Sequence, residues 1–219
     1  MALKNLFNRF MRGSAETKER DSDGSSGADS RFFSTQFLER AEESQALATW
    51  ALRAAEIEAV PLDIAKASPL FAQLWGADRY VAELTPQELL RMSQYLHFVS
   101  VTENQEVIGQ DEQGDYMVIV LEGVLAVDRV QPWGGRVRLA EARAGDMLGE
   151  MSLLDAGTRF SACTTLTPCT LAVVDAKRLD EMIHLEPRLG LALLASLSRR
   201  LSLRLRQVSA RLSALLSSN

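Results

Sequence analysis

The sequence is poor in residues that bind metals or form covalent crosslinks. Among 219 residues it has two cysteines, Cys163 and Cys169, and two histidines, His97 and His184. Both cysteines stand in apolar, strand-like sequence, which favours buried reduced thiols over a disulfide or a metal site. With so few nitrogen and sulfur ligands, the sequence predicts neither a zinc centre nor any other metal cofactor.

The sequence also lacks the long apolar runs of membrane-spanning helices and the pattern of a secretory signal peptide. We therefore expect a cytoplasmic protein. A Walker loop, a nucleophile elbow and a histidine–carboxylate cluster are absent too, so no enzymatic activity is expected. Apolar residues make up 47% of the chain, which is enough for a hydrophobic core and too many for a wholly disordered protein.

The first thirty residues divide into two parts. Residues 2–12 place five large apolar side chains on one helical face and Lys4, Arg9 and Arg12 on the other, without an acidic residue. Such a segment is suited to docking on a protein partner or at the periphery of an anionic membrane, and the alternative is a disordered start with a chance pattern. Residues 13–30 are rich in Ser, Gly, Asp and Glu and are expected to form a flexible tether.

Apolar periodicity predicts a helix from Phe33 to Val60, which Pro61 ends, and short helices after it as far as His97. Thr85 and Glu88 have the spacing of a helix capping box.

From Val99 to Asp175 the sequence changes to short runs of Val, Ile and Leu separated by turn residues. Residues 132–135 (Pro-Trp-Gly-Gly) mark a hairpin tip between strands at 124–130 and 137–142. Regularly spaced short strands predict an antiparallel, jelly-roll-like β-roll rather than a parallel sheet, and Asp175 is placed to cap the next helix. The expected fold class is therefore α+β, a β-roll flanked by helices.

A long last helix is predicted from Pro187 towards Leu216. Its apolar residues recur at heptad spacing: Leu194, Leu201, Val208 and Leu215, with Leu197, Leu205 and Leu212 between them. This stripe predicts a homodimer through the Leu194–Leu215 helix, or alternatively packing on the chain's own body. From Arg188 onwards the sequence carries six arginines and no acid, although the net charge is −5. We expect these arginines to pair with acids such as Glu39, Glu42, Glu43 and Glu56 rather than with nucleic acid.

One stretch, residues 145–162 (GDMLGEMSLLDAGTRFSA), carries the chemistry of a binding site. Glu150 is flanked by Gly149 and is followed nine residues later by Arg159. A carboxylate can accept hydrogen bonds from sugar hydroxyls, and a guanidinium can hold two phosphate oxygens. The backbone N–H groups of Gly149 to Met151 can form an anion-binding nest. The alternative is a surface salt bridge between Glu150 and Arg159.

This stretch resembles the phosphate-binding cassette of the cyclic-nucleotide-binding domain family. The resemblance covers roughly residues 86 to 186, because 106–108, 114–127 and 166–174 look like the strands of that family's β-roll. It implies a ligand site formed by six residues: Gly149, Glu150, Met151, Arg159, Phe160 and Ser161. In this family the long last helix covers the base, which implies that Arg200 or Arg204 lies near it.

The sequence departs from the family pattern at several places. Gln105 and Asp111 stand where glycine is usual, so two turns need other backbone geometry. Phe160 follows the candidate arginine where members selective for cyclic GMP often have Thr or Ser, which favours cyclic AMP over cyclic GMP. In another register Phe160 would itself take the arginine position and the pocket would be inactive. Ser161 either adds a polar group to the phosphate site or is simply a small strand residue.

The sequence as a whole predicts a cyclic-nucleotide receptor that acts through protein contacts, or alternatively a ligand-free scaffold with the same fold. Four units are expected: residues 1–30, an amphipathic segment and tether; 31–85, a helical region; 86–186, the β-roll; and 187–219, a lid and dimerisation helix. Since the sequence stops at Asn219 without a helix-turn-helix, specific DNA binding is not expected.

Overall fold

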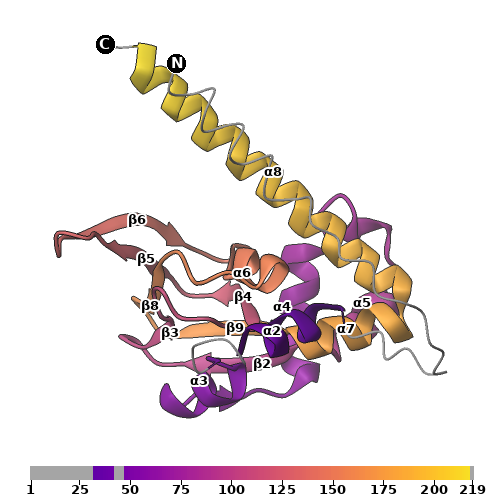
Figure 1. Cartoon of the computed structure of the whole chain (residues 1–219). Coiled ribbons are helices and arrows are strands. Elements are labelled where there is room, and N and C mark those ends of the chain that lie inside the picture. The colour runs from indigo at the N-terminus through magenta and orange to yellow at the C-terminus, as the bar shows by residue number, and fades with distance from the viewer. Residues whose placement is uncertain (1–31, 42–46, 218–219) are drawn as a thin grey trace, which may run out of the picture.

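The computed structural model describes residues 32–41 and 47–217, so the amphipathic segment 2–12 and its tether lie outside the described residues. Two antiparallel sheets form a β-roll with helices around it (Figure 1). Their strands are β1 (Val60–Pro61), β2 (His97–Val101), β3 (Glu106–Ile108), β4 (Tyr116–Glu122), β5 (Leu125–Val130), β6 (Arg136–Ala142), β7 (Met147–Leu148), β8 (Ala162–Thr165) and β9 (Cys169–Asp175). The sheet orders are β1-β2-β9-β4-β7 and β3-β8-β5-β6.

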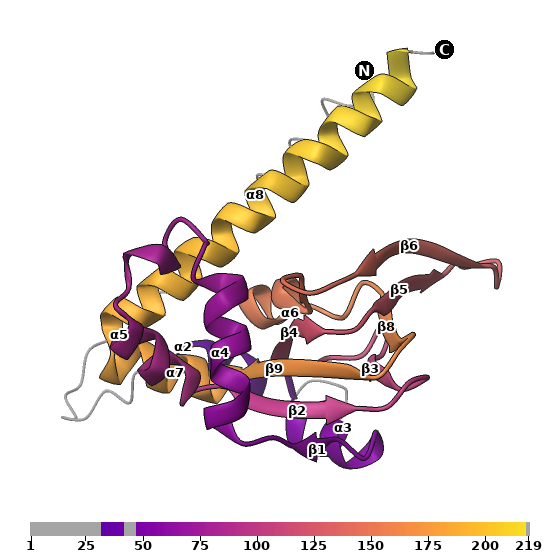
Figure 2. The same ribbon diagram turned by 180° about the vertical axis from the view of Figure 1, so that it is seen from behind.

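The helices lie mainly to one side of the larger sheet (Figure 2). They are α2 (Phe32–Ala41), α3 (Trp50–Glu56), α4 (Ile64–Trp75), the short 3-10 helix η2 (Val81–Glu83), α5 (Pro86–Ser93), α6 (Glu150–Asp155), α7 (Ala176–Leu185) and α8 (Pro187–Ser217). Antiparallel sheets, flanking helices and a long C-terminal helix confirm the predicted α+β β-roll. The division into four units stays a prediction.

The core has two layers because both faces of the larger sheet are covered. Successive side chains of β4 point to opposite sides, as in any strand. Met117 and Ile119 pack against the helices, whereas Val118 and Val120 pack between the two sheets. A strand covered on both sides has a continuous apolar sequence instead of an alternating one. The sequence of β4 is apolar and buried from Tyr116 to Leu121.

The continuous helix predicted from Phe33 to Val60 is wrong. Helix α2 ends at Ala41, and α3 begins only at Trp50, with Thr49 as its cap. Between them the backbone N–H of Ala48 donates to the Gln113 carbonyl at 2.8 Å, and Ala48 forms a β-bridge with Gly114. Pairing with a distant strand start therefore replaces the helical hydrogen bonds that the local pattern favours.

The local start and stop signals behave as predicted. Thr85 and Glu88 exchange both hydrogen bonds of a capping box at the start of α5. The carboxylate of Asp175 caps α7 by accepting from the Arg178 N–H at 2.8 Å, and residues 132–135 connect β5 and β6. Asp111 adopts the left-handed backbone conformation, with φ 63°, so it takes up glycine-like geometry itself.

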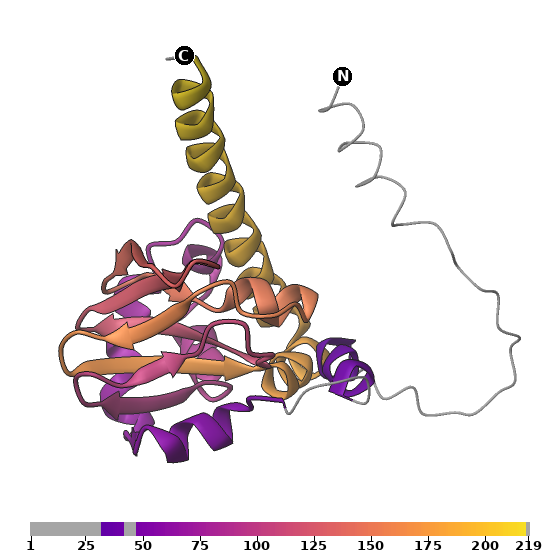
Figure 3. The same cartoon turned by 60° about the vertical axis from the view of Figure 1, so that its left-hand side comes forward.

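Helix α8 belongs to two environments. Its first half packs on the body through Leu189, Leu193 and Leu197, which are fully buried. Its second half extends away from the β-roll, as Figure 3 shows. Every residue from 202 to 217 is exposed. The heptad stripe is thus partly intramolecular, and the change falls near Leu201.

Four arginines of α8 contact acids that the sequence did not single out as their partners. Arg188 contacts Glu88, and both Arg199 and Arg200 lie within 3.8 Å of Asp78. Arg204 pairs with Glu150. Of the four acids expected as partners, Glu56 pairs with Arg53 instead, and the side chains of Glu39, Glu42 and Glu43 lie outside the described residues. Helix packing decides the partners, because α8 crosses α5, η2 and α6 rather than α3.

In the described ranges, no helix has the combination of length and apolarity needed to cross a membrane.

Two carboxylates lie together where β4 begins and β9 ends. Burial, and next the charge of Asp175, raise the pKa of Asp115 to about 6. Among the described residues, Oδ1 of Asp115 is buried and has no hydrogen-bond partner. Burial also acts to raise the pKa of Asp175, but hydrogen bonds from His97 and from the Arg178 N–H lower that pKa overall. Of these two carboxylates, Asp115 is therefore the one whose ionised form is destabilised in the folded protein.

We expect Asp115→Asn to raise the free energy of unfolding near pH 7.5 by on the order of 1–2 kcal/mol. The native Asp115 carboxyl binds its proton more tightly than an unfolded one, whose pKa is about 3.9, so its ionisation above about pH 6 destabilises the fold. The advantage of the variant should shrink as the pH falls from about 7 to about 4. Urea denaturation across this range measures it, and a difference that does not change with pH would contradict the assignment.

Candidate functional site

The stretch 145–162 folds as β7, the short helix α6 and the start of β8. Gly149 caps α6 with a left-handed backbone, φ 79°, which L side chains rarely adopt. A Cβ atom at this position would also lie 2.5 Å from Nη1 of Arg159. Glycine is therefore required here twice, for the turn and for the close approach of the guanidinium.

Glu150 is the first residue of α6, and only 2% of it is exposed. Its Oε1 pairs with Nη1 of Arg204, from α8, at 2.5 Å. Burial raises the pKa of Glu150, against the opposing effect of the Arg204 charge. Gly149 has no side chain to cap the first turn of α6, which comprises Glu150, Met151 and Ser152.

Arg159 is the other buried charge of the stretch, with 1% exposure. Its Nη1 donates to the Gly149 carbonyl at 2.7 Å, and its Nη2 donates to the Tyr116 carbonyl at 2.5 Å. The guanidinium carbon lies 4.8 Å from the centre of the Tyr116 ring. Its Nε is buried and has no hydrogen-bond partner in the part of the chain that the structure describes, and burial lowers the pKa of Arg159.

These residues line a cavity of about 600 Å³ between α6, the β5–β6 hairpin and α8. The six predicted site residues, Gly149, Glu150, Met151, Arg159, Phe160 and Ser161, all belong to its lining. The structure thus brings the six together, while their part in ligand binding stays a prediction. Apolar contributions come from Leu139 on β6 and Val208 on α8.

The burial of the two charges decides between the alternatives that the sequence leaves open. Glu150 and Arg159 do not form a surface salt bridge, because both are buried and Glu150 pairs with Arg204 instead. The two neighbouring side chains also differ in orientation. Arg159 points inward, whereas Phe160 is 59% exposed and its ring lies under the guanidinium of Arg129, 4.2 Å away.

Sequence reasoning found the local part of the site and only one of its distant parts. Arg204, one of two candidates on the last helix, lines the cavity. The other, Arg200, lies over the Trp75 ring at 4.5 Å and donates to the Gly145 carbonyl. The contributions of Leu139, Val127 and Cys163 were missed, since nothing in their local sequence distinguishes them from ordinary strand residues.

The lining of the cavity has three chemically different parts, each suited to bind a different part of one ligand. The Arg159 guanidinium and the amides of the first turn of α6 attract an anion. The Glu150 carboxylate accepts hydrogen bonds from hydroxyl groups. The apolar side chains of Leu139 and Val208 suit a flat, weakly polar ring.

Comparison with known proteins identifies the class to which the β-roll belongs. Residues 98–185, from β2 to α7, match the model of the cyclic nucleotide-binding domain. This match confirms the predicted resemblance to the cyclic nucleotide-binding domain family.

Individual relatives agree with this assignment. A CRP-like cAMP-activated global transcriptional regulator from Mycobacterium tuberculosis is 30% identical over 116 residues, 53% of this chain and 52% of the relative. The chain spans about half the length of the curated relatives it matches. Among solved structures, a cyclic nucleotide-binding domain from Methylobacillus flagellatus has a TM-score of 0.64 at 22% identity, covering 70% of this chain and 85% of that one. The Catabolite Activator Protein of Thermus thermophilus has a TM-score of 0.54 at 25% identity, covering 62% of each chain.

Proposed function

We propose that this protein is a cytoplasmic receptor for a cyclic nucleotide, for cyclic AMP in preference to cyclic GMP, and that it signals through protein contacts without catalysing a reaction. The observation that carries the proposal is the pair of buried charges, Glu150 and Arg159, in one cavity of about 600 Å³. The cyclic phosphate would lie against Arg159 and the first turn of α6, the ribose hydroxyl against Glu150, and the base towards Leu139 and Val208.

The state of Arg159 favours this proposal over a ligand-free scaffold. Within the described residues, the hydrogen bonds of its guanidinium go to two carbonyls, and its Nε has no partner. A buried charge without an opposite charge is costly to maintain, typically by several kcal/mol. A protein that only used its β-roll as a platform would gain nothing from this cost. An anionic ligand would supply the missing charge and the missing acceptor.

The contact between Arg204 and Glu150 suggests how binding would be transmitted. The carboxylate that would accept the ribose hydroxyl is already bound to Arg204 of α8 at 2.5 Å. A ligand that hydrogen-bonds to Glu150 would weaken or strengthen the Arg204–Glu150 ion pair. Helix α8, and α7 packed on it, would then move in response. Helix α7 is packed both on α8 and on the N-terminal helix α2, so the movement would reach both ends of the described chain.

Arg159→Ala is expected to weaken cyclic AMP binding by roughly 30- to 1,000-fold, because it removes a buried charge contact worth about 2–4 kcal/mol. Phe160→Leu is expected to cost far less, although Phe160 also lines the cavity, because its side chain is mostly exposed and lies on Arg129. Isothermal titration calorimetry with cyclic AMP and cyclic GMP measures both variants. Equal affinity of the wild type and Arg159→Ala would refute the pocket, and a wild type that binds neither nucleotide would establish the scaffold alternative.

We also propose that the exposed half of α8 forms a homodimer. Leu201, Leu205, Val208, Leu212 and Leu215 follow each other at alternating steps of four and three, which places them at the a and d positions of a coiled coil. All but Leu201 are more than half exposed. Arg204 and Arg211 take g positions, and the e positions are Ser202, Ser209 and Leu216. A parallel pair therefore sets arginine against serine or leucine, whereas an antiparallel pair would set arginine against arginine.

Leu205→Glu together with Leu212→Glu is expected to convert the dimer into a monomer, because two a positions would bury charges without partners. Leu203→Glu with Ala210→Glu is the control, since both residues lie on the opposite face of the same helix. Sedimentation equilibrium at micromolar concentration distinguishes the variants. A wild type that is already monomeric would show that the stripe does not form a dimer seam.

A further inference from the structure

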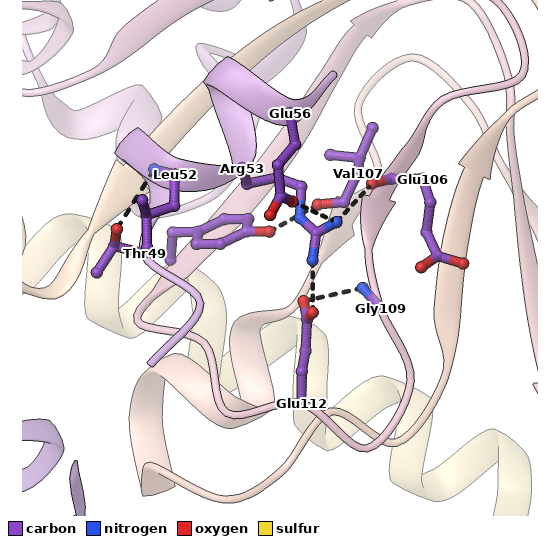
Figure 4. A network of polar contacts seen from close by, with 9 residues as sticks. Thr49, Leu52, Arg53, Glu56, Glu106, Val107, Gly109 and Glu112 are labelled. Carbon is purple, nitrogen blue, oxygen red and sulfur yellow. Dashed lines mark hydrogen bonds and ion pairs between the residues drawn. The ribbon is translucent and has the colours of Figure 1, made fainter. Parts of the chain in front are cut away.

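Helix α3 is joined to the pocket by a cluster of polar contacts on the side of Arg159 that faces away from the cavity. Figure 4 shows Arg53 extending from α3 towards Glu112, which lies in the turn between β3 and β4. Nη2 of Arg53 bonds Oε2 of Glu112 at 2.5 Å, and its Nη1 donates to the Glu106 carbonyl at 3.4 Å. The two paired side chains are only 13% and 21% exposed.

Glu112 connects this ion pair directly to Arg159. Its second carboxylate oxygen accepts the Gly109 N–H at 2.9 Å, which ties down the turn. Its backbone carbonyl accepts the Arg159 N–H at 2.8 Å. The neighbouring Asp111 N–H donates to the Arg159 carbonyl at 2.8 Å. The main chain of Arg159 is thus held by the same short turn that Arg53 holds from the other side.

Tyr116 provides a second connection. Its carbonyl and its ring support the Arg159 guanidinium, and its hydroxyl donates to the Val107 carbonyl at 2.6 Å. The edge of the Trp50 ring, at the start of α3, packs against the Tyr116 ring with centroids 5.3 Å apart. Helix α3 therefore contacts both supports of the guanidinium, the turn through Arg53 and the ring through Trp50.

The charge of Arg53 has a further consequence for an anionic ligand. Glu112 is a carboxylate whose charge acts on Arg159. While Arg53 is bound to it, that negative charge is compensated, and the field at Arg159 remains favourable to an anion. Without Arg53, Glu112 would be a partly buried and uncompensated carboxylate behind the guanidinium. It would then oppose the binding of a phosphate.

We propose that Arg53 is a positioning residue for anion binding: it holds Glu112, and through Glu112 it fixes the orientation of Arg159 and keeps its charge available to the ligand. The segment 47–56 would then be a part of the receptor that adjusts phosphate affinity from outside the pocket. The ligand part of this inference rests on the proposed function, whereas the positioning part concerns Arg159 alone.

A double-mutant cycle tests the ligand part. Arg53→Met keeps the length of the side chain and is expected to weaken cyclic AMP binding by about fivefold to thirtyfold in calorimetry. In an Arg159→Lys background the same change should cost at most about threefold, and less than in the wild type, because only the repulsion between Glu112 and the phosphate remains once the positioning of the guanidinium is lost. Equal losses in the two backgrounds, or no loss in the wild type, would overturn the proposal.

Glu56→Gln is the matched control. Glu56 also contacts Arg53, at 3.0 Å, but its side chain is 62% exposed. We expect its affinity to stay within about twofold of the wild type. A loss as large as that of Arg53→Met would show that α3 acts through its general stability and would count against a specific path through Glu112.

Amide hydrogen exchange without ligand tests the positioning part independently. The N–H of Arg159 should exchange at least about tenfold faster in Arg53→Met than in the wild type, while the amides of β9 keep their rates. If the wild type binds no cyclic nucleotide but this effect is seen, the proposed function fails and the positioning role stands. Unchanged exchange at Arg159 would overturn the positioning role whatever the protein binds.

Discussion

The buried guanidinium of Arg159, which pairs with no carboxylate among residues 32–41 and 47–217, governs the arrangement around the cavity. Taking a cation out of water costs several kcal/mol unless other groups replace its hydration. Here the carbonyls of Gly149 and Tyr116 and the Tyr116 ring replace part of it. The replacement is incomplete, because Nε has no acceptor within the described residues, and burial lowers the pKa of Arg159. The N-terminus of α6 adds positive potential at the same place. Both features favour the entry of an anion.

Two glycines make this arrangement sterically possible. A Cβ atom at Gly114 would lie 2.6 Å from Nη2 of Arg159, and one at Gly149 would lie 2.5 Å from Nη1. The guanidinium therefore fits only where two backbone segments without side chains approach it from both sides. Gly114 also pairs with Ala48, so the same position that admits Arg159 binds the chain that leads into α3. The proposed phosphate site and the N-terminal helices are adjacent for this reason.

The features that the sequence predicted correctly depend on neighbours along the chain. The capping box of α5 involves only residues 85–88, and the hairpin tip only the residues between β5 and β6. Glu150 and Arg159 lie in one strand–helix–strand unit. The failures all involve distant partners. The pairing of Ala48 with Gly114 interrupts a helix that its own periodicity favours. The pairing of Glu150 with Arg204 spans 54 residues, and it depends on the angle at which α8 leaves the body. Patterns of local spacing contain no information about such angles.

Helix α8 contributes to the pocket and to the exposed stripe within the same turn. Arg204 and Val208 line the cavity, while Leu205 between them faces solvent and belongs to the predicted seam. A ligand that changes the Arg204–Glu150 contact and a second chain that covers Leu205 would therefore act on one short length of helix. If both bind, the affinity for the ligand and the affinity between the two chains are linked. Linkage is reciprocal: a ligand that strengthens dimerisation by a given factor binds the dimer more tightly than the monomer by the same factor. The coupling between ligand and assembly then needs no separate relay, because Val208 belongs both to the wall of the pocket and to the predicted seam, and Arg204 lies directly beside that seam.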